Sequence, residues 1–166
     1  QEIAAEFGGG NFQWETLPED RTRLWQARHD ALYAMNALRP GSKPMVTDVC
    51  VPISRLAECI QATKQDHEGS SITAPIAGHV GDGNFHVVYL VDPNDEMEIK
   101  EAADLHERLV MRALAMDGTC TGEHGIGYGK IEFLNAELGE GVAIMRDIKR
   151  ALDPDNIMNP GKILQM

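Results

Sequence analysis

The chain has little positive charge, and this limits the partners that it can bind. Its 166 residues include 15 Lys and Arg but 26 Asp and Glu, which gives a formal net charge of −11. No basic stripe is available to neutralise phosphates, so the composition argues against a nucleic acid or an anionic membrane surface as a partner. The sequence also lacks a run of 18 apolar residues, so we expect no transmembrane segment.

Cysteine is scarce, and its spacing indicates no disulfide framework or metal finger. Cys50, Cys59 and Cys120 are odd in number and show no Cys-x-x-Cys pair, which is typical of reduced thiols in a cytosolic-type compartment. The start of the chain resembles no signal peptide and is not Met, which favours a piece of a longer protein. With 43% hydrophobic residues, we expect one domain or a part of a larger one.

Two phosphate-binding signatures are missing as well. No Gly-x-Gly-x-x-Gly follows an expected strand, and the glycine-rich stretch near residue 127 departs from the P-loop pattern at His124 and at Ile131. We therefore expect that this chain does not bind a dinucleotide by itself.

The spacing of apolar residues predicts a mixture of helices and strands. Helices are expected over 18–38, 54–64 and 95–116, with one or two more up to Leu152. Strands are expected over 11–16, 45–51, 72–80 and 84–91, and a glycine-rich loop over 118–128. This order indicates an α+β domain with a mostly antiparallel sheet and helices packed on one face.

The most informative stretch is the expected hairpin around Asp82 and Gly83. Asp-Gly is a preferred centre for a two-residue type I′ turn, which would place His79 directly opposite His86. Opposed side chains share a face with Cβ atoms about 4.5–5.5 Å apart, so two imidazoles could bind one metal ion there. Asn84 should point to the same side as His86 because strand side chains alternate. A purely structural histidine pair is the alternative interpretation.

A third ligand is expected from the glycine-rich loop, at Glu123. Zinc accepts histidine nitrogen and carboxylate oxygen, and a catalytic site keeps one position open, so His79, His86 and Glu123 form a candidate set for zinc or manganese. We expect these three side chains to converge on one face. His124, next in sequence, is a candidate general base beside the metal.

Five groups of residues, in order along the chain, resemble one family. They are 24–29, 47–52, 78–86, 118–127, and 152–154 together with 158–162. Their combination resembles the C-terminal part of FAD-linked D-2-hydroxyacid dehydrogenases. The resemblance is greatest to the D-lactate dehydrogenase (cytochrome) members, and glycolate oxidase subunits are relatives. It covers nearly the whole chain, about residues 8–164.

The resemblance implies a fold context and a set of roles. Residues 1–166 would be the C-terminal cap, or substrate domain, of a larger flavoenzyme whose N-terminal FAD-binding domain is absent from this sequence. His79, His86 and Glu123 would hold the metal, and His124 would be the base. Further roles by resemblance fall on Arg28 for the substrate carboxylate, Asn84 for substrate or flavin, and Asn159 and Gly125 beside the flavin.

The implied activity is oxidation of a D-2-hydroxy acid to a 2-oxo acid, with hydride transfer to FAD. Leu32 stands four residues after Arg28, where hydroxyglutarate relatives have Thr, and this leans toward a small monocarboxylic substrate such as D-lactate. The expected partners are that acid, the FAD domain, an unspecified electron acceptor and, as one arrangement, a second copy in a homodimer. We expect a cytoplasmic or mitochondrial-matrix location, with any membrane association made through the electron acceptor.

Two other functions compete with this interpretation. In a metal-dependent hydrolase the ion would activate water, but the sequence offers no obvious second acid. The hydrolase interpretation also leaves Arg28 and the Asn159 turn unexplained. The third interpretation is a non-catalytic metal-binding or dimerisation module, which is how the isolated fragment would behave. Without a flavin domain, the isolated chain is expected to be inactive.

Overall fold

The computed structural model describes residues 1–10 and 14–166 and divides them into two compact units, 1–40 and 41–166. The first unit contains α1 (Glu2–Glu6), α2 (Pro18–His29) and α3 (Ala31–Asn36). Of the strand expected over 11–16, residues 11–13 lie outside the described residues, and Trp14, Glu15 and Thr16 are not in a strand.

The single helix expected over 18–38 is wrong, because α2 and α3 are separated at Asp30. The backbone of Asp30 has ψ −5°, well away from the helical value of about −42°. Its carboxylate accepts hydrogen bonds from the Gln26 amide at 3.0 and 3.1 Å. A side-chain pair at this i,i+4 spacing supports a helix, so it does not cause the break. Asp is a weak helix former because its carboxylate can bind nearby backbone N–H groups in non-helical conformations.

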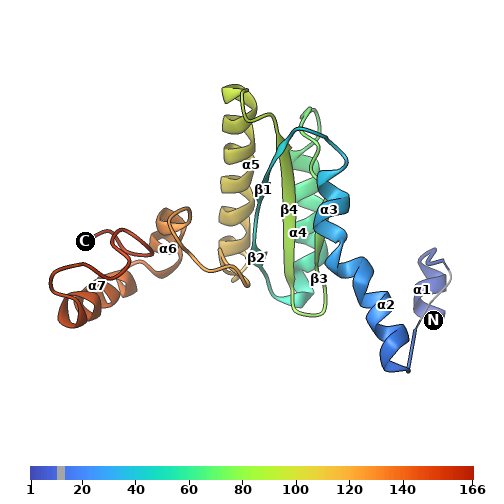
Figure 1. Ribbon diagram of the computed structural model, residues 1–166, viewed down its shortest axis with the longest axis horizontal. Helices are drawn as coiled ribbons and strands as arrows, with labels where there is room; N and C mark the ends of the chain where they lie inside the picture. Colours follow the sequence, from blue (N-terminus) through green and yellow to red (C-terminus); the bar gives the residue numbers. More distant parts are fainter. Residues whose placement is uncertain (11–13) are drawn as a thin grey trace. The chain divides into compact units, whose positions relative to one another are not determined.

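The second unit is built around one central strand. β4 (Asn84–Val91) is buried along its whole length and pairs antiparallel with β1 (Lys43–Val46), β2 (Val49–Cys50) and β3 (Ile76–His79). The expected strand over 45–51 is interrupted, because β1 and β2 pair with successive segments of β4 and leave Thr47 and Asp48 between them (Figure 1). In this gap the Thr47 hydroxyl, rather than a backbone carbonyl, accepts the N–H of Val87 at 2.7 Å.

The hairpin register differs from the expected one by two residues. His79 lies opposite Asn84, and His86 lies opposite Ala77. A type I′ turn needs positive φ at both central residues, but only Gly83 has it (77°). Instead, the Asp82 N–H donates to His79 O at 2.8 Å, and Gly83 O accepts the N–H of Val51 at 3.0 Å.

Gly83 is therefore required for a close contact with Val51, the residue after β2, rather than for the centre of a type I′ turn. A Cβ built at this glycine would lie 2.0 Å from Val51 O, so no side chain fits there. Because strand faces repeat every two residues, the two-residue difference leaves His79 on the same face as Asn84 and His86.

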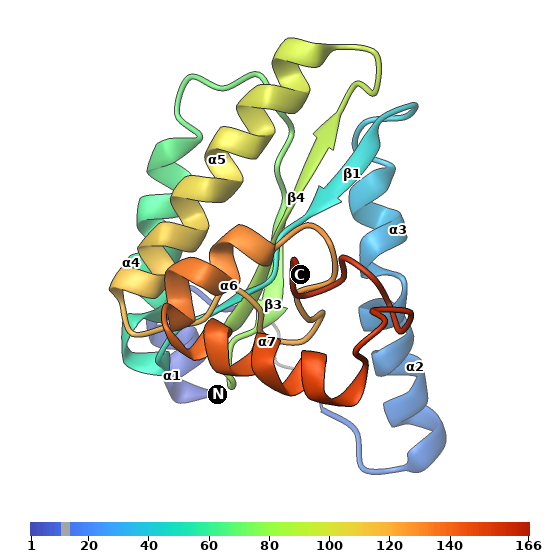
Figure 2. The same cartoon turned by 90° about the vertical axis from the view of Figure 1, so that its left-hand side faces the viewer.

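Helices cover one face of this sheet, as expected. α4 (Ile53–Asp66) and α5 (Glu96–Ala115) lie side by side, and Figures 1 and 2 both show α5 running along β4. Alternate β4 residues join side chains of the two helices in one core, which includes Phe85, Val87, Tyr89, Val91, Leu56, Cys59, Leu105 and Leu109. The chain continues through α6 (Ile131–Leu138) and α7 (Gly141–Leu152). The α+β class with an antiparallel sheet is confirmed.

Two acidic side chains bind backbone N–H groups at the start of α5. The Asp95 carboxylate accepts the backbone N–H groups of Met97 and Glu98 at 2.9 and 3.1 Å. The Glu98 carboxylate accepts the N–H of Asp92. Asp95 and Glu98 together therefore bind N–H groups both in the first turn of α5 and in the turn before it.

One half-buried histidine of α5, His106, should make stability depend on pH. Burial, with a smaller contribution from the Lys130 charge, lowers the pKa of His106 to about 4 from an ordinary value of 6.5. The folded state therefore keeps His106 neutral where the unfolded chain binds a proton. Its stabilisation is complete above about pH 6.5 and is lost as the pH falls toward 4, by at most about 3 kcal/mol.

We expect the wild-type melting temperature to fall more steeply between pH 6.5 and 4 than that of a His106→Leu variant. His106 Nε2 is buried without a hydrogen-bond partner among the described residues, so the substitution leaves no partner unpaired at that atom. Thermal melts at half-unit pH steps measure the difference. Parallel curves for the two proteins would show that His106 is not the group responsible.

Candidate metal and proton-transfer site

Three of the expected site residues converge near the turn end of the β3–β4 hairpin. His86 Nε2 lies 2.7 Å from Glu123 Oε1, and His79 Nε2 lies 3.9 Å from the same oxygen. One ligand atom from each residue falls within 4.8 Å of the other two. The convergence expected from the sequence is therefore present, although the histidines are diagonal neighbours with ring centroids 6.5 Å apart.

His124 lies on the other side of His86. The two imidazole rings stack with centroids 5.0 Å apart and an angle of 13° between their planes. His124 Nε2 is 3.7 Å from Glu123 Oε1, and its side chain is 49% exposed. This imidazole is therefore next to the His–Glu cluster and open to a small molecule.

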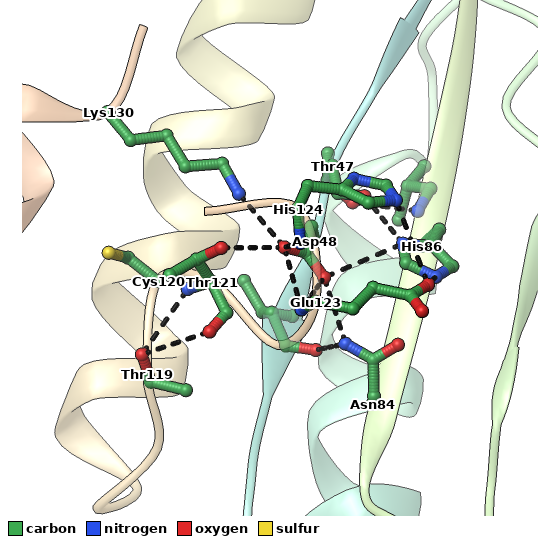
Figure 3. Close-up of polar contacts among 12 residues, drawn as sticks. Thr47, Asp48, Asn84, His86, Thr119, Cys120, Thr121, Glu123, His124 and Lys130 are labelled. Carbon is green, nitrogen blue, oxygen red and sulfur yellow. Dashed lines mark hydrogen bonds and ion pairs between the residues drawn. The ribbon is translucent and has the colours of Figure 1, made fainter. Parts of the chain in front are cut away.

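The hydrogen bonds of His86 determine which of its nitrogens can bind a metal. Its Nδ1 lies 2.8 Å from the carbonyl oxygen of Thr47, which can only accept, so Nδ1 carries the proton. In the neutral ring the Nε2 lone pair then faces the Glu123 carboxylate (Figure 3). A separation of 2.7 Å is also that of a hydrogen bond, so a proton on Nε2 satisfies the two atoms when no ion is bound. A carbonyl on the far nitrogen is the usual support of a metal-binding histidine.

Asp48 organises this site from beneath. It is fully buried in the gap between β1 and β2. Its carboxylate accepts hydrogen bonds from five groups (Figure 3): the backbone N–H of Glu123 (3.1 Å) and of His124 (2.8 Å), the Thr121 hydroxyl (2.8 Å), the Asn84 amide (3.0 Å) and the Lys130 ammonium (3.2 Å).

These donors keep Asp48 ionised. Burial by itself raises the pKa of this carboxyl, but the bonds from His124, Asn84 and Thr121, together with the Lys130 charge, hold the pKa well below its usual range. Lys130 is itself largely buried, with 11% of its side chain exposed. The pair therefore forms a shielded, hydrogen-bonded ion pair directly under the loop.

Asn84 has one orientation that satisfies its neighbours. Its Nδ2 donates to Asp48 Oδ1 and to Val49 O at 3.0 and 3.1 Å, and both of these atoms can only accept. Its Oδ1 is buried and has no hydrogen-bond partner among the described residues. Gly122 lies against this amide so closely that a Cβ would sit 1.8 Å from Nδ2. The site therefore holds one unused oxygen acceptor.

Among the described residues, two sets have the geometry to hold a metal, and they differ in which of their atoms have lone pairs available. The sets are His79, His86 and Glu123, and Asp48, His86 and His124. The lone pairs of Asp48 are already taken by its five donors, which leaves none directed to an ion. The first set is therefore the better candidate, and it matches the set expected from the sequence.

A small hollow opens beside this set. It has a volume of about 190 Å³ and is lined by Cys50, His79, Asp82, Asn84, Gly122 and Glu123. Burial, with the nearby charges of Asp82 and Asp48, raises the pKa of the Cys50 thiol. Cys50 is therefore an unreactive wall of the hollow.

The remaining expected site residues are Arg28, Asn159 and Gly125, which follows His124 directly. Arg28 is on α2 in the first unit and is exposed. Asn159 and Gly125 both have positive φ, at 47° and 76°, and a Cβ at Gly125 would meet open space. The roles of these three residues, like those of the cluster, stay predictions.

Sequence reasoning missed the support of the site. Thr47, Asp48 and Lys130 were assigned no role, although Thr47 and Asp48 fall inside a segment that was recognised by resemblance. The signal in the sequence was an acidic residue within an expected strand of mostly apolar residues, 45–51. Such a residue is rarely buried without partners, so it pointed to a polar network.

The fold and the cluster together define the class: an antiparallel α+β domain with a histidine–carboxylate site. A family model described as "FAD linked oxidases, C-terminal domain" matches residues 1–163. The chain belongs to this family.

The relatives are longer than this chain. It is 56% identical to the probable mitochondrial D-lactate dehydrogenase of Danio rerio, over 100% of this chain and 34% of the relative. It is 47% identical to the mitochondrial D-lactate dehydrogenase (cytochrome) of Arabidopsis thaliana, over 99% and 29%. The glycolate oxidase subunit GlcD of Bacillus subtilis is 34% identical over 87% and 31%. The chain thus spans about a third of the length of these relatives.

A solved structure shares the fold at low sequence identity. The 4-ethylphenol oxidase of Gulosibacter chungangensis superposes with a TM-score of 0.62 at 20% identity. The match covers 90% of this chain and 31% of that one.

Proposed function

We propose that this chain is the substrate-binding cap of an FAD-dependent dehydrogenase that oxidises a D-2-hydroxy acid, D-lactate or a close analogue, to the 2-oxo acid. The observation that carries the proposal is the meeting of His79, His86 and Glu123 beside His124. Relatives that are 56% and 47% identical are named D-lactate dehydrogenases, which supports the substrate.

The donor set suits a divalent zinc or manganese ion. His86 offers the Nε2 lone pair, Glu123 offers a carboxylate oxygen at 2.7 Å from it, and His79 completes three protein ligands. When bound, the ion supplies positive charge that attracts the substrate's oxygen atoms and acidifies its hydroxyl group. Three ligands leave room for the substrate.

The other side chains have roles that follow from their available atoms. His124 Nε2 takes the hydroxyl proton, because this imidazole is exposed next to the metal ligands. Asn84 presents only its Oδ1, so it accepts a hydrogen bond from a substrate or cofactor donor. The guanidinium of Arg28 binds the substrate carboxylate, for which a bidentate pair is the favoured geometry.

FAD is held mostly by parts of the protein outside this chain. When bound, it supplies the two-electron acceptor for the reaction. Asn159 and Gly125 approach it, since both lie in turns with positive φ where the backbone is exposed. An apolar face of α7 is available for the domain that holds the cofactor: Ile144, Ile148 and Leu152 recur every four residues and are 65%, 55% and 77% exposed.

The names of the relatives also suggest an electron acceptor and a location. The Arabidopsis relative carries the words cytochrome and mitochondrial in its name, so we propose a cytochrome acceptor in mitochondria. Among the described residues no helix is long and apolar enough to cross a bilayer.

The full-length protein provides the test. D-lactate should reduce an artificial dye acceptor, and L-lactate should stay near the background rate. Dialysis against EDTA should abolish turnover while the flavin absorbance is retained, and added Zn²⁺ or Mn²⁺ should restore it. Equal rates with both enantiomers, or full activity after the metal is removed, would refute the proposal.

A further inference from the structure

We infer that Asp48 is a positioning residue, which holds Glu123, His124 and Asn84 in their working geometry from within the gap between β1 and β2. This inference rests on the proposed function, because it assigns Asp48 a part in the same site. It concerns a residue that touches neither the substrate nor the metal.

The first argument is where the five donors come from. Two of them are the consecutive backbone N–H groups of Glu123 and His124, the expected metal ligand and base. Another is the amide of Asn84, on the central strand of the sheet. One carboxylate therefore fastens the glycine-rich loop to β4 and fixes the distance between the groups on each.

The second argument is the backbone around Asp48. The Thr47 carbonyl accepts from His86 Nδ1, and the Asp48 carbonyl accepts from the N–H of Gly122 at 3.3 Å. The interruption of the strand thus aims two carbonyls and one carboxylate at the site. A continuous strand would use these carbonyls in its ladder.

The third argument is the charge balance. A buried carboxylate is costly unless it is paired and hydrogen-bonded, and Asp48 has both Lys130 and four other donors. One of these donors is the hydroxyl of Thr121, which is in the same loop as Glu123 and His124 and lies 2.8 Å from Asp48 Oδ2. In an Asp48→Asn variant, the amide NH₂ group would face N–H donors, and the Lys130 charge would lose its partner.

A substitution series in the full-length protein tests the inference. We expect Asp48→Asn to weaken Zn²⁺ affinity by about 10–100-fold, the range for residues that orient metal ligands. Thr121→Val, which removes a single donor to Asp48, should weaken it several-fold. Metal content by mass spectrometry, competition with a chelator and hydrogen exchange at the Glu123 and His124 amides are the measurements.

Glu137→Gln is the matched control. Its carboxylate also fastens the loop, through the Cys120 N–H at 2.9 Å and the Thr119 hydroxyl at 3.1 Å, but before the Glu123–His124 pair. We expect metal affinity within about two-fold of wild type for this variant, well below the cost of losing an orienting residue. An equal loss in Glu137→Gln and Asp48→Asn would show general loop loosening and overturn the inference.

The series also separates the inference from the proposed function. Wild-type protein that binds no metal would refute the proposed function. A different result would overturn the positioning role alone. In it, the wild type binds the metal, and Asp48→Asn shows the same metal affinity and the same amide exchange at Glu123 and His124. If Asp48→Asn does not fold, Thr121→Val decides by the same criteria.

Discussion

Replacing His124 with Ala should lower kcat of the full-length protein by about 10²–10⁴-fold, the usual contribution of a general base. The metal should be retained, because His124 is not in the preferred ligand set. Its side chain is half exposed, which leaves space for a small replacement base. Added imidazole should therefore restore part of the lost turnover. Steady-state kinetics with D-lactate, with and without imidazole, measure both effects.

His67→Gln is the control for this substitution. His67 packs edge-on against Tyr89, with ring centroids 5.4 Å apart. Its substitution should therefore leave kcat near the wild-type value. Metal loss in His124→Ala would assign His124 to the ligand set. Wild-type turnover in His124→Ala would exclude it as the base.

Replacing His79 with Ala should remove the metal, with at least about 100-fold weaker affinity, since losing a ligand costs more than losing an orienting residue. His79 belongs to only one of the two sets that could hold an ion. The His79→Ala and His124→Ala variants therefore give opposite results for the two sets. Zinc titration followed by a chromogenic chelator measures the affinities.

The outcome also tests whether the site works as a metal site at all. If His79→Ala binds the ion as tightly as wild type while His124→Ala loses it, the ligands are Asp48, His86 and His124. If His79→Ala and His124→Ala lose metal affinity to the same extent, neither set of three describes the ligands, and the assignment to His79, His86 and Glu123 is wrong. Glu123→Gln, which keeps the shape and removes the charge, should resemble His79→Ala.

The shared face of His79 and His86 could be predicted from the sequence because it depends on local rules, whereas Glu123 reaches them through a loop held by Asp48, 75 residues earlier. Strand alternation puts His86 and Asn84 on one face, and an even register difference cannot move His79 from that face. The register itself could not be predicted. It depends on a contact between Gly83 and Val51, which are far apart in sequence.

The strand interruption was beyond sequence reasoning for a similar reason. The residues from Met45 to Val51 are largely apolar and favour one strand. What divides it is a set of donors that arrives from residues 121–130, more than 70 positions later. The break at Asp30, where ψ departs from the helical value, is also something that no apolar pattern reveals. Polar networks of this kind follow from tertiary structure.

The interrupted strand has a consequence for how the protein can evolve. Valine or isoleucine at Thr47 and Asp48 would suit a continuous β-ladder and would dispense with a buried ion pair. Selection for thermal robustness and selection for catalysis therefore act in opposite directions on the same two positions. A laboratory lineage evolved only for heat resistance should drift toward an unbroken sheet and a silent site, while its overall architecture stays intact.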